Sequence, residues 1–169
     1  GMLFVGLAIF SCLYSTQALL PTLTEALGVS PSQAALTVSA ATGALAVCVV
    51  PASILSEKFG RGRVLTISAT AATAIGFALP LSQSIGQMIA LRALQGVLIA
   101  GTPAVAMAWL SEEIDERDLP RAMGLYIAGN TVGGLMGRLV PAFVLEVASW
   151  RWALMVSGAV SFALAAAAW

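Results

Sequence analysis

The sequence has no histidine, and only 9% of its 169 residues are charged. Without histidine it lacks the usual general base and the commonest ligand of transition metals, so we expect no metal site and no histidine-dependent catalytic dyad. A soluble domain has about 25% charged residues on average. Here 59% of the residues are hydrophobic and the mean hydropathy is +0.94, which excludes a water-soluble globule and predicts a membrane protein.

Cysteine is also scarce, and the net charge is zero. Cys12 and Cys48 lie in apolar stretches with no disulfide or metal-binding pattern around them, so we expect both to be packing residues. Eight basic and eight acidic residues cancel, and no long-range field favours nucleic acid. The sequence therefore predicts no nucleic-acid partner and no cofactor, with membrane lipid as the surrounding partner.

Six stretches are long and apolar enough, or nearly so, to be membrane helices. A helix needs about 20 mostly apolar residues to cross about 30 Å of hydrocarbon. Because lipid offers the backbone no hydrogen bonds, each span must be a helix, and the first is expected to be retained because it lacks signal-peptide features. The sequence predicts an all-α membrane protein with spans at about 2–21, 32–55, 64–82, 86–110, 121–147 and 153–169.

Basic residues are distributed unevenly between the loops. The loop 56–63 has three of them and the loop 111–121 has two, whereas the loops on the opposite side have only Arg151. Since basic side chains resist translocation, we expect both basic loops and the amino terminus to be cytoplasmic in a multi-pass membrane protein. The run that begins at Ser111 is expected to be a solvated loop.

The sequence contains an internal repeat. A shift of 90 residues aligns GALAVCVVPASIL from Gly43 with GGLMGRLVPAFVL from Gly133, and the two segments share Val-Pro-Ala at the same place. Chance is the alternative explanation, because apolar segments use few residue types. An odd number of spans per repeat inverts the second copy, so we expect two inverted three-helix repeats, at about 1–85 and 86–169.

Two motifs resemble the major facilitator superfamily of transporters. Between the second and third spans, SILSEKFGRGR resembles the family's G-x-L-a-D-R-x-G-R-[RK] loop, with Glu57 and Lys58 in place of aspartate and arginine and serine in place of the first glycine. In the fourth span, Arg92, Gln95 and Gly96 reproduce the family's R-x-x-Q-G motif. The resemblance covers the whole chain as the amino-terminal six-helix half of such a transporter.

A third motif, GNTVGGLMGR in the fifth span, is similar to the family's antiporter motif G-x-x-x-G-P-x-x-G-G. Gly134 stands where proline is usual and Arg138 stands where the last glycine is usual. With the later SWRW, these residues most resemble the arabinose-efflux-permease-like and drug-efflux branch. The resemblance implies secondary active transport of a small-molecule substrate by alternating access, with proton-coupled efflux through an antiporter.

The resemblance also implies a second bundle. A complete member has two six-helix bundles, so either the carboxy-terminal half is missing from this chain or a second copy of the chain replaces it. The alternative is a stand-alone six-helix interaction or channel-like protein that works as a homodimer. An intramembrane serine protease would need a Ser-His dyad, which the absence of histidine excludes, and we therefore expect no enzyme.

The loop after the second span is the first candidate site. The resemblance implies a cytoplasmic gate that latches against the other bundle, whereas the alternative is a plain positive-inside anchor. A glycine and an acidic residue are not needed for anchoring, which favours the latch. The candidate gating residues are Glu57, Lys58, Gly60, Arg61 and Arg63.

Two arginines inside the spans are the second candidate site, because a charge in lipid is costly and should face protein or water. Arg92 shares a helix face with Gln95, and the resemblance implies a role in substrate binding or coupling; snorkelling to the interface is the alternative. Arg138 lies deeper, with Asn130 nearby, and is expected to line a cavity or to form a buried ion pair. No carboxylate lies at comparable depth, so no proton carrier is assigned.

Polar and small residues complete the candidates. In the first span Ser11, Tyr14 and Gln17 are expected to line the cavity or, alternatively, to form interhelical hydrogen bonds. Small residues allow close helix packing. The expected packing positions are Gly96, Gly129, Gly133, Gly134, Gly137 and Pro141.

Overall fold

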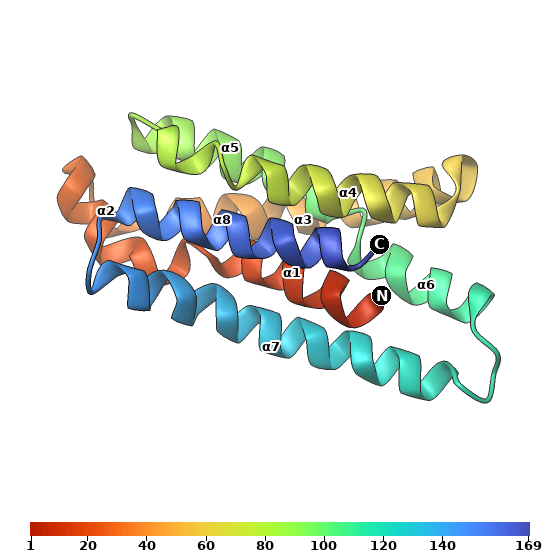
Figure 1. Cartoon of the computed structure of the whole chain (residues 1–169). Helices are drawn as coiled ribbons and strands as arrows, with labels where there is room; N and C mark the ends of the chain where they lie inside the picture. The colour runs from red at the N-terminus through yellow and green to blue at the C-terminus, as the bar shows by residue number, and fades with distance from the viewer.

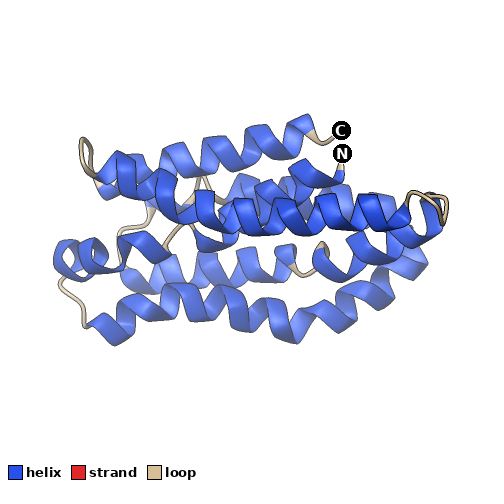
Figure 2. Ribbon diagram, turned by 90° about the horizontal axis from the view of Figure 1, so that it is seen from below, coloured by secondary structure: helices blue, strands red, loops and turns tan.

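The computed structural model describes all 169 residues, which form helices joined by short turns (Figures 1 and 2). The helices make six rods, and three of the rods contain a break. The first rod contains α1 (Met2–Tyr14), the 3₁₀ turn η1 (Gln17–Leu19) and α2 (Leu20–Leu27); the second is α3 (Pro31–Phe59); the third contains α4 (Arg61–Ile75) and η2 (Leu79–Leu81); the fourth contains α5 (Ile85–Ile99) and α6 (Pro103–Glu113); the last two are α7 (Leu119–Leu145) and α8 (Trp150–Ala167).

These rods confirm the six expected spans, with ends that differ by a few residues. Five rods are long and apolar enough to cross a membrane. The exception is α7, which has 27 residues but also Asn130, Arg138 and a series of glycines that lower its hydropathy. Two expected loops were too long: residues 111–113 continue α6 as helix, and residues 56–63 are helical except for Gly60, because serine and charged residues extend a helix readily beyond its apolar part.

Local sequence signals set several helix ends. Ser30 caps α3: its Oγ accepts a hydrogen bond from Gln33 N (3.2 Å), while Ser30 N donates to Gln33 Oε1 (3.0 Å). Such a capping box satisfies backbone groups that the first turn leaves free. Gly60 lies between α3 and α4 at φ +92°, where a side chain would be strained, so the chain reverses there without a longer loop.

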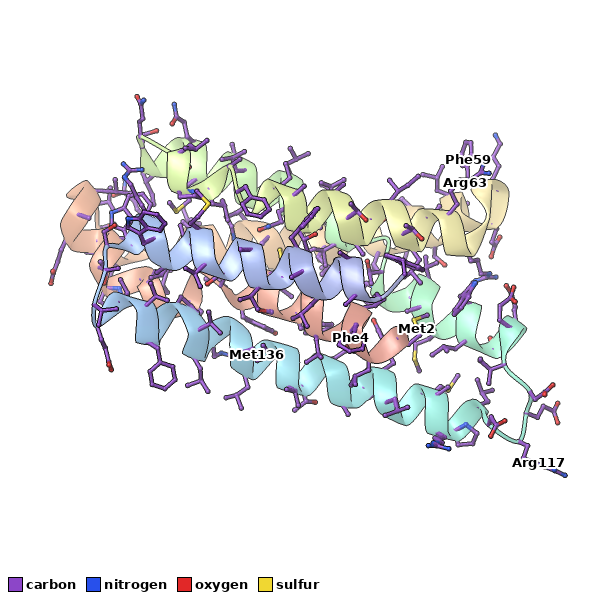
Figure 3. The ribbon with its side chains drawn as sticks, in the orientation of Figure 1. Met2, Phe4, Phe59, Arg63, Arg117 and Met136 are labelled. Carbon is purple, nitrogen blue, oxygen red and sulfur yellow. The ribbon has the colours of Figure 1, made fainter.

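The turns gather at two ends of the bundle. Figure 1 shows the two chain termini at the same end as the α3–α4 and α6–α7 turns, and Figure 3 shows Arg63 and Arg117 projecting there. The turns after α2, η2 and α7 lie at the opposite end, where Arg151 is found. The end with the termini therefore has five of the eight basic residues: Lys58, Arg61, Arg63, Arg117 and Arg121.

The packing follows the internal repeat. A shift of 90 residues maps α1 onto α5, α3 onto α7 and α4 onto α8. Each pair runs in opposite directions through the bundle (Figure 1). Helix α1 packs most closely on α7. The helices equivalent to these two in the other repeat, α5 and α3, also pack most closely on each other. The fold is thus two inverted three-helix repeats, while their division near residue 85 stays a prediction.

A ridge of glycines lets α7 approach α1. A Cβ atom added to Gly129 would lie 2.4 Å from Leu3 O, and one added to Gly133 would lie 2.6 Å from Leu7 O. A Cβ added to Gly137 would lie 2.5 Å from Ser11 O. These distances are too short for any real contact, so the two backbones touch where α7 has no side chain.

Other expected packing positions lie along the same contacts. A Cβ added to Gly96 on α5 would lie 2.1 Å from Ala41 O on α3, which is the equivalent close approach in the other pair of helices. Gly134 lies against the ring of Tyr14, and Pro141 is buried inside α7 without ending the helix. Small residues therefore define both close contacts of the repeat.

Replacing Gly133 by alanine tests this contact. We expect Gly133→Ala to lower the free energy of unfolding by about 1–3 kcal/mol, because the added methyl group forces the two backbones apart. The measurement is thermal or denaturant unfolding of the purified protein in micelles.

The matched control is Gly124→Ala, which lies on the same helix with open space around its Cβ position. Alanine favours the helix by about 1 kcal/mol over glycine, so this variant should be as stable as the wild type or more so. Equal stability of the two variants would contradict the close approach of α1 and α7.

Candidate functional site

The first rod breaks inside the bundle. Helix α1 ends at Tyr14, a turn covers residues 15 and 16, and the chain continues as η1. The last carbonyl groups of a helix have no partner within it. At a surface water would satisfy them, but inside a membrane the protein must do so. Within the turn, Ser15 Oγ donates to Cys12 O at 3.0 Å, and the break needs further hydrogen-bond donors from a neighbouring helix.

Arg92 on α5 supplies those donors. Its Nη1 donates to Cys12 O (3.1 Å) and its Nη2 donates to Leu13 O, so the guanidinium caps the end of α1. Its Nε donates to Thr37 O on α3 at 3.0 Å. The side chain is completely buried. The positive charge faces the negative end of the α1 dipole, which stabilises a cation without any carboxylate.

Gln95 extends these contacts to a further helix. Its Oε1 accepts a hydrogen bond from Arg92 Nη1, and its Nε2 donates to Ala72 O on α4 at 2.9 Å. Its Nε2 also lies 2.8 Å from Cys12 Sγ. We name Arg92, Gln95 and Cys12 the Arg92 cluster. It links α5 to α1, α3 and α4 through buried polar contacts.

The Arg92 cluster has no open side in this conformation. Arg92 and Gln95 both have 0% exposure, and four hydrogen bonds occupy the guanidinium. The side chain reaches inward to α1 and α3, away from the interface to which it was alternatively expected to snorkel. Its geometry is that of a positioning residue, and any contact with a solute would first require α1 to move. The sequence did not identify Cys12 and Thr37 as partners of Arg92 and Gln95. Any residue can accept a hydrogen bond through its backbone carbonyl group, so no sequence motif marks these positions.

Arg138 on α7 forms a second group with residues of the first rod. Its Nε donates to Gln17 Oε1 at 2.7 Å, and its Nη1 donates to Gly134 O at 3.1 Å. Its guanidinium carbon lies 4.2 Å from the centre of the Tyr14 ring, in a cation–π contact. We name Arg138, Tyr14 and Gln17 the Arg138 cluster. The break after Tyr14 brings Gln17 to this position.

The Arg138 cluster, unlike the Arg92 cluster, lies open on one side of the bundle. Arg138 and Gln17 are exposed, and Tyr14 is partly exposed. The two ion pairs of the structure both involve Arg61, so Arg138 has no carboxylate partner and Glu146 does not reach it. A positive charge is thus held in place by an amide, a carbonyl group and an aromatic ring.

The structure does not bring Ser11 and Asn130 into the Arg138 cluster. Ser11 is 1% exposed and its backbone packs against Gly137. Asn130 lies beside Gly6, where α7 meets α1, and its Oδ1 is buried without a hydrogen-bond partner. Both residues lie within the contact between the two helices.

The junction of α3 and α4, in which only Gly60 is not helical, is tied to the end of α6. Arg61 Nε lies 2.9 Å from Glu112 Oε1 and its Nη2 lies 3.8 Å from Glu57 Oε1. The side chain of Arg61 is 20% exposed and that of Glu112 is 54% exposed. Lys58 lies 6.0 Å from the centre of the Phe59 ring. Arg63 is exposed at the end of the bundle (Figure 3).

Sequence reasoning missed Glu112 as the partner of Arg61 because it placed residues from 111 onward in a solvated loop. The sequence did offer one signal, because Arg61 and Glu112 have opposite charges and both were expected on the cytoplasmic side. The acidic residue falls in the last turn of α6, at a point where only the folded chain brings it to Arg61.

The chain is similar in sequence to known membrane transporters. The family model described as the Major Facilitator Superfamily matches residues 2–169. The chain is 39% identical to the uncharacterized MFS-type transporter YybF of Bacillus subtilis over 156 residues, 92% of this chain and 39% of YybF. It is 36% identical to the inner membrane transport protein YnfM of Escherichia coli over 162 residues, 96% of this chain and 38% of YnfM.

A more distant similarity is to the MFS antiporter QDR3 of Candida albicans, which is 34% identical over 115 residues, 66% of this chain and 16% of QDR3. The chain therefore spans less than half of the length of the curated relatives that it matches.

Removal of the Arg92 guanidinium should destabilise the bundle. Hydrogen bonds to charged groups contribute about 1.5–3 kcal/mol each, and Arg92→Gln shortens the side chain so that it cannot reach both α1 and α3. We expect a loss of about 3 kcal/mol or more in the free energy of unfolding, measured by denaturant unfolding in micelles. Arg117→Gln in the exposed α6–α7 turn is the control and should change stability by less than about 0.5 kcal/mol. If Arg92→Gln leaves the free energy of unfolding unchanged, water or other groups must already donate hydrogen bonds to the carbonyl groups at the break.

A double-mutant cycle tests the pairing of Arg61 with Glu112. For partly exposed ion pairs we expect a coupling free energy of about 0.2–1 kcal/mol, lower at high salt, between Arg61→Gln and Glu112→Gln. The same cycle with Glu113→Gln, an exposed neighbour without an ion pair, should give no coupling. If Arg61 shows the same coupling free energy with Glu112 and with Glu113, there is no specific ion pair, and the coupling is a general effect of charge at this end of the bundle.

Proposed function

Because this chain belongs to the major facilitator superfamily, we propose that it is the amino-terminal six-helix bundle of a secondary transporter. The transporter moves a small solute across the bacterial inner membrane by alternating access, with two bundles rocking about a site near the middle of the membrane. It makes and breaks no covalent bond in the solute. The transporter names of its relatives support this proposal.

The Arg138 cluster is the observation that supports the proposal most directly. Polar and ionisable side chains within membrane spans are costly and normally face a bundle interior or a water-filled cavity. Arg138, Tyr14 and Gln17 share one open side of the bundle, contributed by α1, η1 and α7. A solute between two bundles would meet this side first.

A second bundle is part of the proposal. The chain spans 39% of YybF and 38% of YnfM, which leaves room in such a protein for six further spans. The second rod is the least covered, with Val47 76% exposed and both Val50 and Ile54 64% exposed. We propose that a carboxy-terminal bundle, rather than a second copy of the chain, covers part of this surface; lipid covers the rest.

The loop between α3 and α4 is proposed to act as a cytoplasmic gate. The ion pair of Arg61 with Glu112 keeps the loop against α6, and Gly60 gives the sharp turn that this position needs. The exposed Lys58 and Arg63 are then free to contact the second bundle when the cytoplasmic side closes. The five basic residues at this end support a cytoplasmic location for it and for the amino terminus.

Proton-coupled efflux is the proposed mode of transport. The antiporter name of the Candida albicans relative supports antiport, as do the glycines of α7. In this chain every carboxylate lies toward a helix end or in a turn, so the proton carrier is proposed to lie in the second bundle. Arg92 would then position α1 rather than exchange protons.

Proton flux in everted membrane vesicles tests the function. With the complete transporter present and a respiratory pH gradient established, a transported solute should release protons and restore the fluorescence of a pH-sensitive dye. A panel of neutral, cationic and anionic solutes is screened for this response. We expect Arg138→Gln to reduce the response at least about tenfold, the effect of losing about 1.4 kcal/mol of binding, and Arg117→Gln to leave it unchanged.

The same assay separates the two arrangements of bundles. Vesicles that contain only residues 1–169 should show no response, whereas activity from that chain alone would favour a dimer of two copies. If no solute in the panel dissipates the gradient and none accumulates, the proposed proton-coupled transport is wrong.

A further inference from the structure

Arg138 is a fixed positive charge for which this bundle provides no anion. The eight carboxylates of the chain all lie toward the ends of the bundle: Glu25, Glu57, Glu112, Glu113, Asp115, Glu116, Asp118 and Glu146. Glu146, the residue that follows α7, is eight residues beyond Arg138, which corresponds to about 12 Å along a helix. Neither ion pair of the structure involves Arg138.

The guanidinium has donors to spare. Nε donates to Gln17 and Nη1 donates to Gly134 O, and no partner is assigned to Nη2. The two contacts that exist hold the planar group in one orientation, and Nη2 of this exposed side chain has no partner within the bundle. Two adjacent guanidinium nitrogens match the two oxygens of a carboxylate, an arrangement that lysine cannot reproduce.

Aromatic rings lie next to this charge. The Tyr14 ring is 4.2 Å from the guanidinium carbon, and the Phe10 ring centre is 6.3 Å from that of Tyr14. Phe10 and Tyr14 are one turn apart on α1, and both are partly exposed. A flat unsaturated group can stack on such rings while a charged group attached to it reaches the guanidinium.

We propose that the Arg138 cluster binds the carboxylate of an organic anion that carries an aromatic or conjugated group. This inference rests on the proposed transport function and gives the chemical class of its substrate. Arg138 binds the carboxylate through Nη2 and the unused N–H of Nη1, Gln17 holds the guanidinium in place, and Tyr14 with Phe10 contacts the flat group.

The test uses the complete transporter in nanodiscs of phosphatidylcholine, with benzoate as the probe and benzamide as its neutral counterpart of the same shape. At about 10 mM benzoate and a Kd of about 1 mM, ligand linkage predicts a rise in Tm of about 1–2 °C for a transporter of roughly 400 residues. Benzamide should give no rise. Arg138→Gln should abolish the benzoate shift, Arg138→Lys should weaken binding at least about tenfold, and Tyr14→Ala should weaken it several-fold. Arg117→Gln should respond as the wild type does.

Several results would overturn the proposal. One is the absence of a benzoate shift in the wild type while Arg138→Gln by itself lowers Tm, which indicates a carboxylate of the second bundle as the partner. Another is a shift on adding phosphatidylglycerol that depends on Arg138 while benzoate has no effect, which indicates a lipid phosphate. Equal shifts with benzoate and benzamide, or a benzoate shift that persists in Arg138→Gln, exclude anion recognition at this cluster.

The outcome is separate from that of the proposed function. If the protein moves neutral or cationic solutes in vesicles but its Tm does not rise with benzoate, the proposed transport function stands and the proposed anion site is wrong. A protein that binds benzoate through Arg138 but moves no solute keeps the site and loses the transport function.

Discussion

A guanidinium enclosed by backbone carbonyl groups holds the broken first rod of this bundle against its neighbours. Helix α1 stops at Tyr14 and leaves buried carbonyl groups, and Arg92 supplies a donor for Leu13 O and, together with Ser15, for Cys12 O. The same side chain also binds Thr37 O, so a single residue connects α5 to α1 and α3. Because lipid provides no competing hydrogen bonds, these contacts determine where the first rod bends and where Gln17 lies.

The two arginines inside the spans show how the surroundings decide the role of a charge. Arg92 is surrounded by carbonyl dipoles and is fully buried, so its charge is already stabilised within the bundle. Arg138 has one carbonyl group, one amide and one aromatic ring, and one side of it remains open. The first arrangement stabilises a helix break, and the second leaves a cation able to attract an anion. The break that Arg92 stabilises places Tyr14 and Gln17 beside Arg138, which links the two clusters.

Close helix contacts at glycine explain how an inverted repeat can build both halves of the bundle. The ridge of Gly129, Gly133 and Gly137 brings α7 onto α1, and Gly96 brings α5 onto α3 in the equivalent contact. In lipid there is little hydrophobic gain when helices associate, so close packing of small residues contributes much of the stability. The Val-Pro-Ala segments of α3 and α7 lie within helices that continue past their prolines.

Hydropathy, loop charge and a few motifs were enough to predict the helical fold, because a bilayer admits few alternatives. Apolar length predicted six rods within a few residues, and the 90-residue repeat predicted their inverted pairing. Residue type and one family motif also singled out Arg92, Gln95, Tyr14, Gln17 and Arg138 as polar groups within the spans. The end of α6 was wrong at 111–113 because charged residues mark the membrane boundary and not the end of a helix.

By itself the sequence determined that the chain is a helical membrane protein, where its six helical rods lie, and which residues within them are polar. Only the tertiary structure decided what each of them does: Arg92 meets carbonyl groups from α1 and α3, Arg138 meets Gln17 across 121 positions of sequence, and Arg61 meets Glu112. The physical reason is that hydrophobicity and charge belong to a residue, whereas the partners of a buried or half-buried group depend on which helices pack together and where one of them breaks.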